Sequence, residues 1–464
     1  MASLSSQPNA WNLAYNPNIF TLGALGADDQ FGIKVYSPDI SSGNIIATYK
    51  QSANPAGVAH FNVSKILESQ LQPSYTEWNT LLGETPLAAV TYQVAIGHYT
   101  NNVWFQDGAS AIKIAVNGYS GWRVKDWDYV DYIPEPDAVE CLCEGIDCIP
   151  FNAEYTRTYE WLTNFPITNN DGDKKYNVRS DEWKTLSFVP RILNWNDGTI
   201  WGPNESAFFV KYTYYNSAGV VAAIDIKTIS DGNGLSIRTD CQDMSTHNYA
   251  DAQLIATIGV GPQNIKDSIV YFPPAVASYK VEIYSFASCY ANDNGPISDC
   301  DDVGELIDYL GDKIYGAEFI INDSCQKFDP ITISFLNAFG VVDYFTANKR
   351  NTYTSSITRN NFKQQLGSWS SSTWNIAETG RGRRTFSTMA TTQMTLTSDW
   401  MTDAESIWLE ELFTSPHANI YINGAWEPVV ILSTEYQQMT SARNGLFQHE
   451  ITVQFANDKN IQRG

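Results

Sequence analysis

Three cysteines lie close together before the middle of the chain, and cysteine thiolates are common zinc ligands. Cys141, Cys143 and Cys148 form a C-x-C-x4-C pattern. A structural zinc site needs four ligands, usually from two paired knuckles, but Cys241, Cys289, Cys300 and Cys325 are scattered. The pattern therefore predicts no metal. Unpaired thiols, or a disulfide formed after assembly, are the favoured alternatives.

Histidine is the usual acid–base residue near neutral pH, and the chain has only five. His98 and His449 fall on apolar faces of expected strands, so we interpret both as core residues with a hydrogen-bond partner. The P-loop, H-E-x-x-H and G-x-S-x-G motifs are absent. Gly259-Val260-Gly261 and Gly380-Arg381-Gly382 both lack the third glycine of a dinucleotide fingerprint. The sequence therefore predicts no catalytic residue, no cofactor and no enzyme.

Acidic residues next to asparagines or aromatics allow two further kinds of site. Asn170-Asp171-Gly172-Asp173 and Asn292-Asp293-Asn294-Gly295 lack the spacing of a calcium loop and are interpreted as polar turns. Glu77-Trp78, Asp126-Trp127-Asp128-Tyr129 and Glu182-Trp183 combine carboxylates with aromatic rings. Such groups could bind a glycan, or cleave one if two carboxylates faced each other. They equally suit β-sandwich cores and subunit interfaces.

A basic cluster stands out in an otherwise acidic chain. The 464 residues carry a formal net charge of −22, yet Arg381, Arg383 and Arg384 lie together, with Lys349, Arg350 and Arg359 upstream. Residues 1–330 hold 19 Lys/Arg and 40 Asp/Glu, whereas residues 331–464 hold 10 and 11. Two interpretations stay open: a solvated loop, or an inter-subunit contact between this loop and an acidic neighbour.

Strand patterns dominate the elements that must position these residues. Residues 90–98 alternate with a period of two, residues 207–229 indicate a hairpin, and residues 279–283 and 447–455 indicate further strands. Aromatic residues make up 13% of the chain. We therefore expect a mainly β fold: multidomain β-sandwich or β-barrel-like domains with a few short helices.

Helix and turn signals are fewer. Thr402-Asp403-Ala404-Glu405 is a capping box that predicts a helix over Thr402–Phe413. Shorter helices are expected over residues 64–70 and 302–311. Asn423-Gly424 and Asn444-Gly445 predict hairpin turns. The domains expected from these patterns are an N-terminal β domain at 1–125, an acidic middle β region with the cysteine-containing loop at 126–330, and a C-terminal β domain at 331–464.

The overall composition excludes several classes of protein. The aromatic content and a charged fraction of only 17% argue against disorder. An acidic chain lacks the basic footprint of a nucleic-acid binder. No apolar run reaches the roughly 18 residues of a membrane helix, and Lys34 is the first basic residue, so we expect no secretory signal.

Several segments together resemble one group of viral proteins. NPNIFTLGALGADDQFGIKVYSPD, AGVAHFNVSKILESQL and TYQVAIGHY are similar to the start of structural virion proteins of tailed double-stranded DNA phages that infect Bacteroidota, including crAss-like phages. EWLTNFPI and IGVGPQNI resemble their middle elements. SDWMTDAESIWLEELFTSPHANIYINGAWEPVVILST resembles a C-terminal block. The chain departs from the pattern at Asn62, where an acid is usual, and at His98.

The resemblance implies a tail, baseplate or connector component without catalytic residues. We therefore expect a homo-oligomeric ring or sleeve that is assembled in the host cytoplasm, joins neighbouring tail proteins and belongs to the virion. Its acidic surface would suit a position beside a DNA channel without binding DNA. The main alternative is a receptor- or glycan-binding tail module, and a glycan-degrading tail enzyme ranks below it.

Overall fold

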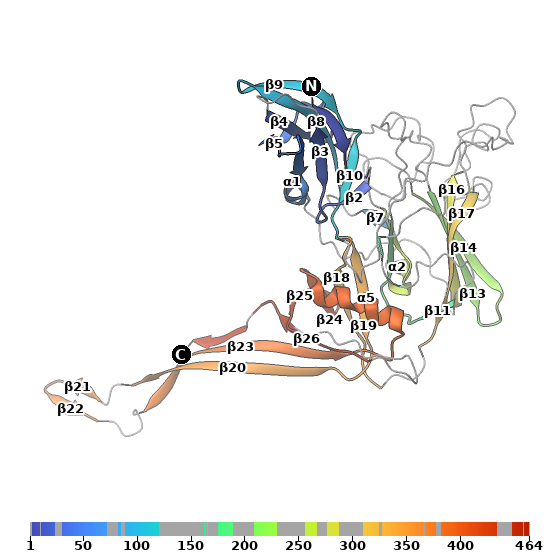
Figure 1. Cartoon of the computed structure of the whole chain (residues 1–464). Coiled ribbons are helices and arrows are strands. Elements are labelled where there is room, and N and C mark those ends of the chain that lie inside the picture. Colours follow the sequence, from blue (N-terminus) through green and yellow to red (C-terminus); the bar gives the residue numbers. More distant parts are fainter. Residues whose placement is uncertain are drawn as a thin grey trace. The chain divides into compact units, whose positions relative to one another are not determined.

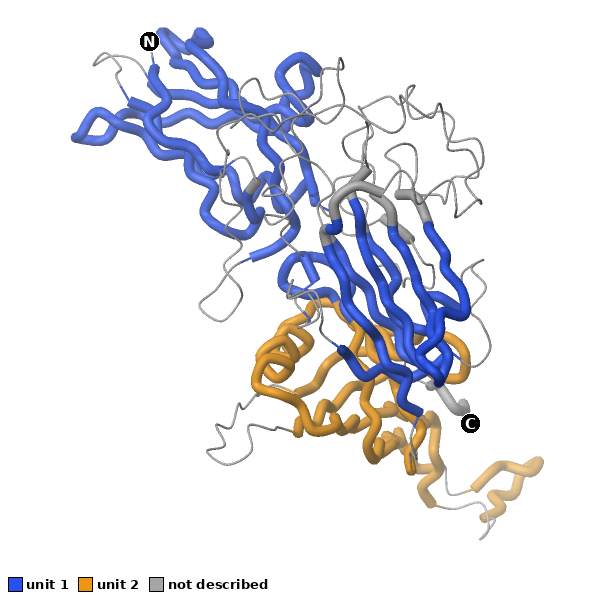
Figure 2. Tube along the Cα trace, turned by 90° about the vertical axis from the view of Figure 1, so that its right-hand side faces the viewer, with its two compact units in different colours: residues 1–324, 336–343 blue, residues 325–335, 344–464 orange. Residues whose placement is uncertain are grey.

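The computed structural model is mainly β, as expected, with several separate sheets and few short helices. It describes residues 2–9, 11–23, 30–71, 82–84, 89–119, 162–163, 165, 175–188, 208–229, 256–266, 276–286, 310–323, 327–364, 367–376, 382–433, 448–457 and 459–463. The chain divides into two compact units, coloured blue and orange in Figure 2. Unit 1 comprises residues 1–324 and 336–343, and unit 2 comprises residues 325–335 and 344–464.

The first part of unit 1 is a β-sandwich. Its larger sheet has the order β2 (Trp11–Leu13), β10 (Lys113–Val116), β8 (Ala89–Thr100), β4 (Gln30–Tyr36) and β5 (Ile45–Ser52), and β9 (Val103–Ala109) also pairs with β8. The smaller sheet has the order β1 (Ser3–Ser6), β3 (Ile19–Gly23) and β6 (Ala59–Asn62), followed by helix α1 (Ser64–Gln70). Alternate residues of both sheets, such as Phe20, Phe31 and Tyr92, fill one buried core.

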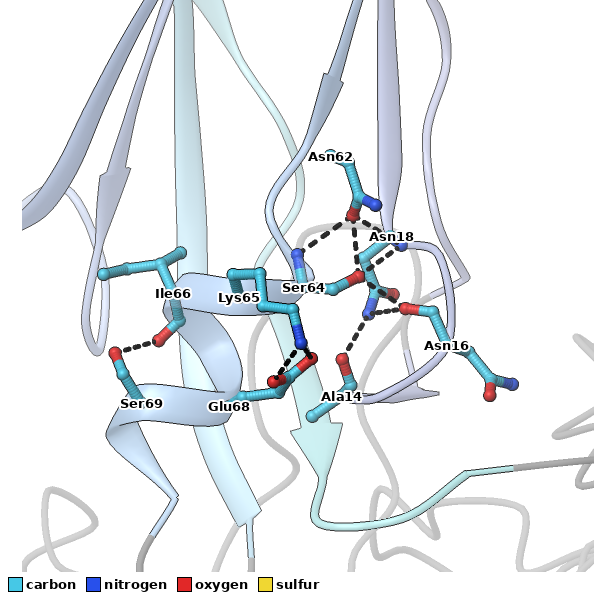
Figure 3. Close-up of polar contacts among 9 residues, drawn as sticks. All are labelled: Ala14, Asn16, Asn18, Asn62, Ser64, Lys65, Ile66, Glu68 and Ser69. Atoms are coloured by element: carbon cyan, nitrogen blue, oxygen red, sulfur yellow. Dashed lines mark hydrogen bonds and ion pairs between the residues drawn. The ribbon is translucent and has the colours of Figure 1, made fainter.

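A polar network fastens the start of α1 to the segment before β3 (Figure 3). The Asn62 side-chain oxygen accepts from the backbone N–H of Ser64 at 3.0 Å. Asn18 is buried and donates its side-chain amide to the carbonyl oxygen of Leu13 at 2.9 Å and to that of Asn16 at 3.0 Å. Asn62 acts as an acceptor in the first of these contacts, a role that an aspartate carboxylate could also fill.

The second part of unit 1 has its own core. One sheet has the order β11 (Lys175–Val178), β17 (Leu310–Ile321), β16 (Val276–Phe286), β13 (Phe208–Asn216) and β14 (Val221–Ile229). The other has the order β12 (Thr185–Phe188), β15 (Ala256–Gly259) and β7 (Leu82–Glu84), with helix α2 (Pro262–Lys266) after β15. The Tyr212 and Tyr279 hydroxyls donate to backbone oxygens of residues 259 and 260, so these large buried rings leave no hydroxyl unpaired.

Two expectations in this part change. Strand β7 comes from the first 125 residues but pairs with β15, so a strand pair crosses the expected boundary at residue 125. The helix expected over residues 302–311 does not reach its predicted end, because Leu310 and Gly311 belong to strand β17. Residues 302–309 lie outside the described residues. The prediction treated Gly311 as a helix stop, whereas the buried residues Tyr315, Ala317 and Phe319 show the alternation of a strand.

Unit 2 is built on an eight-stranded sheet backed by one helix. The sheet has the order β19 (Val342–Ala347), β18 (Ile331–Leu336), β24 (Ala418–Ile422), β25 (Ala425–Ile431), β26 (Glu450–Phe455), β23 (Arg383–Thr397) and β20 (Thr352–Lys363), and β27 (Lys459–Arg463) also pairs with β23. A separate hairpin joins β21 (Ser368–Ser370) to β22 (Thr373–Asn375). Residues 336–343, at the ends of β18 and β19, count with unit 1.

Helix α5 (Asp403–Thr414) confirms the predicted capping box. Thr402 accepts from the backbone N–H of Glu405, whose carboxylate accepts from the N–H of Thr402 at 2.8 Å. The helix covers the sheet with Trp408, whose ring lies 5.5 Å from Phe335 and 6.4 Å from Phe345 between centroids. The predicted turn at Asn423-Gly424 is also confirmed, with φ of 52° and 81°. The turn predicted at Asn444-Gly445 lies outside the described residues.

The buried turn within residues 336–343 is held by one asparagine. The Asn337 side chain donates to the carbonyl oxygen of Leu162 at 2.8 Å and accepts from the backbone N–H of Phe339 at 2.9 Å. Gly340 adopts φ +75°, and a Cβ there would overlap the backbone oxygen of Asn117. This position therefore requires glycine for both its conformation and its space.

We expect Gly340→Ala to lower the free energy of unfolding of unit 1 more than Gly219→Ala does. Gly219 has nearly the same φ, +74°, but open space around it, so it is the matched control. The left-handed conformation costs an alanine about 1–2 kcal/mol at either position. Forcing a methyl group into a packed site costs about 1–3 kcal/mol more. Urea unfolding that gives equal losses for the two variants would contradict the close packing at Gly340.

Candidate inter-subunit interface

Strand β20 lies at the outer edge of the unit 2 sheet and is exposed at every one of its positions. Among the described strands it pairs only with β23. Figure 1 shows these two strands running on as a narrow ribbon, with the β21–β22 hairpin at its far end. We call residues 352–397 the arm. Its free edge presents backbone N–H and C=O groups that can pair with another strand.

One face of the arm continues the core-facing side of the sheet. Met394 is buried and shares its face with Ala390, since they are four residues apart on β23. Their direct partners on β20 are Tyr353 and Ile357, which therefore point to the same side. Tyr353 is 57% exposed and Ile357 is 47% exposed. The core-facing side of the sheet therefore continues onto the arm as an exposed apolar stripe formed by Tyr353 and Ile357.

The hairpin at the end of the arm carries two tryptophans. Trp369 and Trp374 are direct cross-strand partners, and their ring centroids lie 5.3 Å apart in an edge-to-face arrangement. Trp369 is 69% exposed. The pair stabilises the short hairpin, and it also places a large apolar surface where another molecule can reach it.

The arm is positively charged in a negatively charged chain. Residues 352–397 contain five Lys or Arg and a single Asp or Glu, Glu378, a net charge of +4. Lys363 and Arg383 stand directly opposite each other on β20 and β23. Like charges in this position repel. Among the described residues, no carboxylate forms an ion pair with either of them or with Arg359 and Arg384.

Two of the three predicted contact residues lie on a strand and not in the expected loop. Arg383 and Arg384 are the first residues of β23, exposed and in register with Lys363 and Phe362. Arg381 lies outside the described residues. The basic cluster was interpreted as a loop, but β23 begins at Arg383. Whether the arginines contact a neighbour stays a prediction, and the surface to which they belong is the arm.

Sequence reasoning missed the arm itself. Its strands are rich in Thr, Ser and Asn, so they lack the apolar alternation that marks a half-buried strand. The available signal was compositional: 46 consecutive residues with one acid in a chain that has 51. Threonine is also a strong strand former.

The other sequence candidates do not assemble into a described site. Cys141, Cys143 and Cys148, both calcium-like loops, and the pairs at residues 77–78 and 126–129 lie outside the described residues. Trp183 is buried, so it offers no platform beside Glu182. In the part of the chain that the structure describes, no three His, Cys, Asp or Glu residues converge on a possible metal position.

Both singled-out histidines have polar partners. His98 Nδ1 lies 2.6 Å from Asp107, which also accepts from the backbone N–H of Ala2. Burial alone would raise the pKa of Asp107, but these two hydrogen bonds hold that pKa below its usual value. His449 is buried in unit 2, with Nε2 2.8 Å from Ser406 Oγ. Burial lowers the pKa of His449 below 6.5.

Comparisons with known proteins identify no family. No protein-family model matches the chain, and no curated protein matches it either. Among solved structures, the crystal structure of calcium binding domain CBD12 of CALX1.1 is similar over 69% of this chain and 100% of that one, at 8% identity and a TM-score of 0.18. A likeness of this size carries no argument for this chain. No helix in the described ranges is long and apolar enough to cross a membrane.

The buried His449 predicts a pH dependence for the stability of unit 2. The folded state holds this ring neutral, whereas the unfolded chain takes up a proton near pH 6.5. The unfolded state therefore binds more protons below that pH, and the free energy of unfolding should fall as the pH drops from 7.5 to 5.5. His449→Gln should flatten this slope, and His417→Gln, at an exposed histidine, should leave it in place. Identical slopes for all three proteins in urea unfolding would contradict the assignment.

Proposed function

We propose that this protein is a structural subunit that assembles with copies of itself, the arm of one copy lying on its neighbour. The observation that carries the proposal is the free edge of β20: twelve consecutive exposed residues on an arm of net charge +4. A long exposed edge strand is a liability in a monomer, because any other strand can pair with it. Burial in an assembly removes that liability.

Charge favours a second copy as the partner. The arm is basic, while residues 1–330 carry a net charge of −21. Opposite charges steer two copies into arm-to-body contact, and like charges disfavour arm-to-arm contact. The exposed side chains of Tyr353, Ile357 and Trp369 supply the apolar and aromatic area that is typical of the centre of stable interfaces.

The finer proposal rests on the resemblance to phage virion proteins. The protein is then a ring or sleeve component of a phage tail or connector that joins neighbouring tail proteins. It is assembled in the host cytoplasm and is carried in the virion. A subunit that clasps its neighbours with an arm suits a permanent ring, in which each copy both gives and receives one contact. This role requires no catalytic residue.

The exposed tryptophan pair favours one alternative. A receptor- or glycan-binding tail module would use Trp369 and Trp374 as a stacking surface at the end of a projecting arm. In that case the tip stays uncovered in the assembled particle. A soluble quencher would then reduce the fluorescence of Trp369 and Trp374 equally in the monomer and in the assembly. Such a result would support this alternative over an arm that lies on a neighbouring copy.

Charge reversal at Arg383 tests the proposed assembly directly. Arg383→Glu places a carboxylate opposite Lys363, so the monomer should keep its thermal midpoint or gain slightly. Association should weaken by at least about 1 kcal/mol per interface, because an attraction becomes a repulsion. Lys65→Glu, on the exposed face of α1, changes the net charge equally and should leave association unaltered.

The measurement is size-exclusion chromatography with light scattering over a range of protein and salt concentrations. If Arg383→Glu associates like the wild type at every salt concentration, the arm is not part of the interface. If the wild-type protein stays monomeric at all concentrations, the proposed self-assembly is wrong.

A further inference from the structure

Among the described residues, no carboxylate pairs with the cations of the arm, and the sequence contains a segment that can supply such carboxylates. Residues 126–148 hold eight Asp or Glu and no Lys or Arg, a net charge of −8 within 23 residues. The described part of the arm holds no carboxylate, and Lys363 and Arg383 repel each other across the ribbon. A bound anionic segment would turn that repulsion into attraction.

We propose that residues 126–148 of one copy bind along the free edge of β20 in the neighbouring copy. This inference rests on the proposed self-assembly and names the surface that the arm engages. The mode of binding is strand addition, in which backbone hydrogen bonds supply affinity and side chains supply register. The acids meet Arg359, Lys363, Arg383 and Arg384.

The composition of the segment fits this mode of binding. Its first eight residues, Asp126 to Ile133, interleave three acids with Trp127, Tyr129, Val130 and Tyr132. Aromatic and β-branched residues are strong strand formers, and they match the exposed stripe of Tyr353 and Ile357. Eight extended residues span about 26 Å, within the roughly 40 Å of the twelve-residue strand β20. Pro134 and Pro136 then end the pairing, since proline cannot donate to a ladder.

A second acidic run provides the matched control. Residues 290–312 hold seven Asp or Glu and no Lys or Arg, but their only aromatic residues are Tyr290 and Tyr309. Their C-terminal end is already paired in β17. If charge alone selected the partner, this run would serve almost as well as residues 126–148. If strand addition with aromatic contacts selects it, only residues 126–148 matter.

The test is a charge swap in the full-length protein. The arm variant combines Arg359→Glu, Lys363→Glu and Arg383→Glu. The segment variant combines Asp126→Lys, Asp128→Lys and Asp131→Lys, and the control variant combines Asp299→Lys, Asp301→Lys and Asp302→Lys. Association is measured by sedimentation at low and high salt, for each variant alone and for the arm and segment variants mixed in equal amounts.

The arm and segment variants should each associate at least about 100-fold more weakly than the wild type, because like charges then face each other at every interface. Their mixture should recover association to within about tenfold, since each reversed arm can then meet a reversed segment and each native arm a native one. The control variant should associate like the wild type. Recovery that fades at high salt would further support charge pairing.

Four outcomes would overturn the inference. If the arm variant fails to associate but the segment variant associates normally, self-assembly through the arm stands and its assignment to residues 126–148 falls. If the control variant is the one that fails, residues 290–312 replace them. If the arm variant itself associates normally, the proposed function falls as well. Should the lysine substitutions lower the thermal midpoint, Asp126→Asn, Asp128→Asn and Asp131→Asn must still weaken association, and normal association of that variant would equally overturn the inference.

Discussion

The backbone edge of β20 that no described strand pairs with is the constraint on which the proposed function depends. Every second N–H and C=O group along that edge points away from β23, and all twelve side chains of the strand are exposed. At residues 383–386, before β23 meets β27, the arm is only a two-stranded ribbon, and such a ribbon is marginal on its own. Another strand along this edge would satisfy its backbone groups, cover Tyr353 and Ile357, and oppose Arg359 and Lys363 with carboxylates.

The rest of the molecule shows the opposite design. In unit 1, alternating side chains fill two separate cores, and the hydroxyls of Tyr212 and Tyr279 and the side-chain amide of Asn337 donate hydrogen bonds to backbone oxygens. In unit 2, the ring of Trp408 contacts both Phe335 and Phe345, so α5 is fixed on one part of the sheet. The arm leaves that covered region on a strand, β23, that is buried at Met394 and exposed at Arg383. A single strand thus joins a rigid body to an exposed surface.

Local signals in the sequence predicted the local structure well. Thr402 and Glu405 defined the start of α5, Asn423-Gly424 defined a hairpin, and the alternation over residues 90–98 defined β8. These features depend on neighbouring residues and on one buried face. The mainly β fold follows from the same patterns, repeated along the chain.

Features that depend on distant pairing were harder to predict. The strand that begins at Arg383 depends on pairing with β20, where its partner Lys363 lies twenty residues earlier in the chain. Polar strands of Thr and Ser carry no period-two apolar signal. Gly311 was taken as a helix stop, but a glycine inside a strand gives the same sequence signal. Only the pairing of β17 with β16 shows that this segment is a strand. The basic cluster was recognised from charge alone. Only the fold shows that this cluster lies on a ribbon at the edge of the sheet.

Hydrogen exchange of the β20 amides, measured by mass spectrometry on the monomer and on the assembled protein, tests the central claim most directly. The account predicts that peptides from residues 352–363 contain a rapidly exchanging fraction in the monomer, the amides that point away from β23, and that this fraction becomes protected on assembly, while peptides from the core strand β18 stay equally protected in both. Assembly that forms while residues 352–363 keep their monomer exchange rate would contradict it.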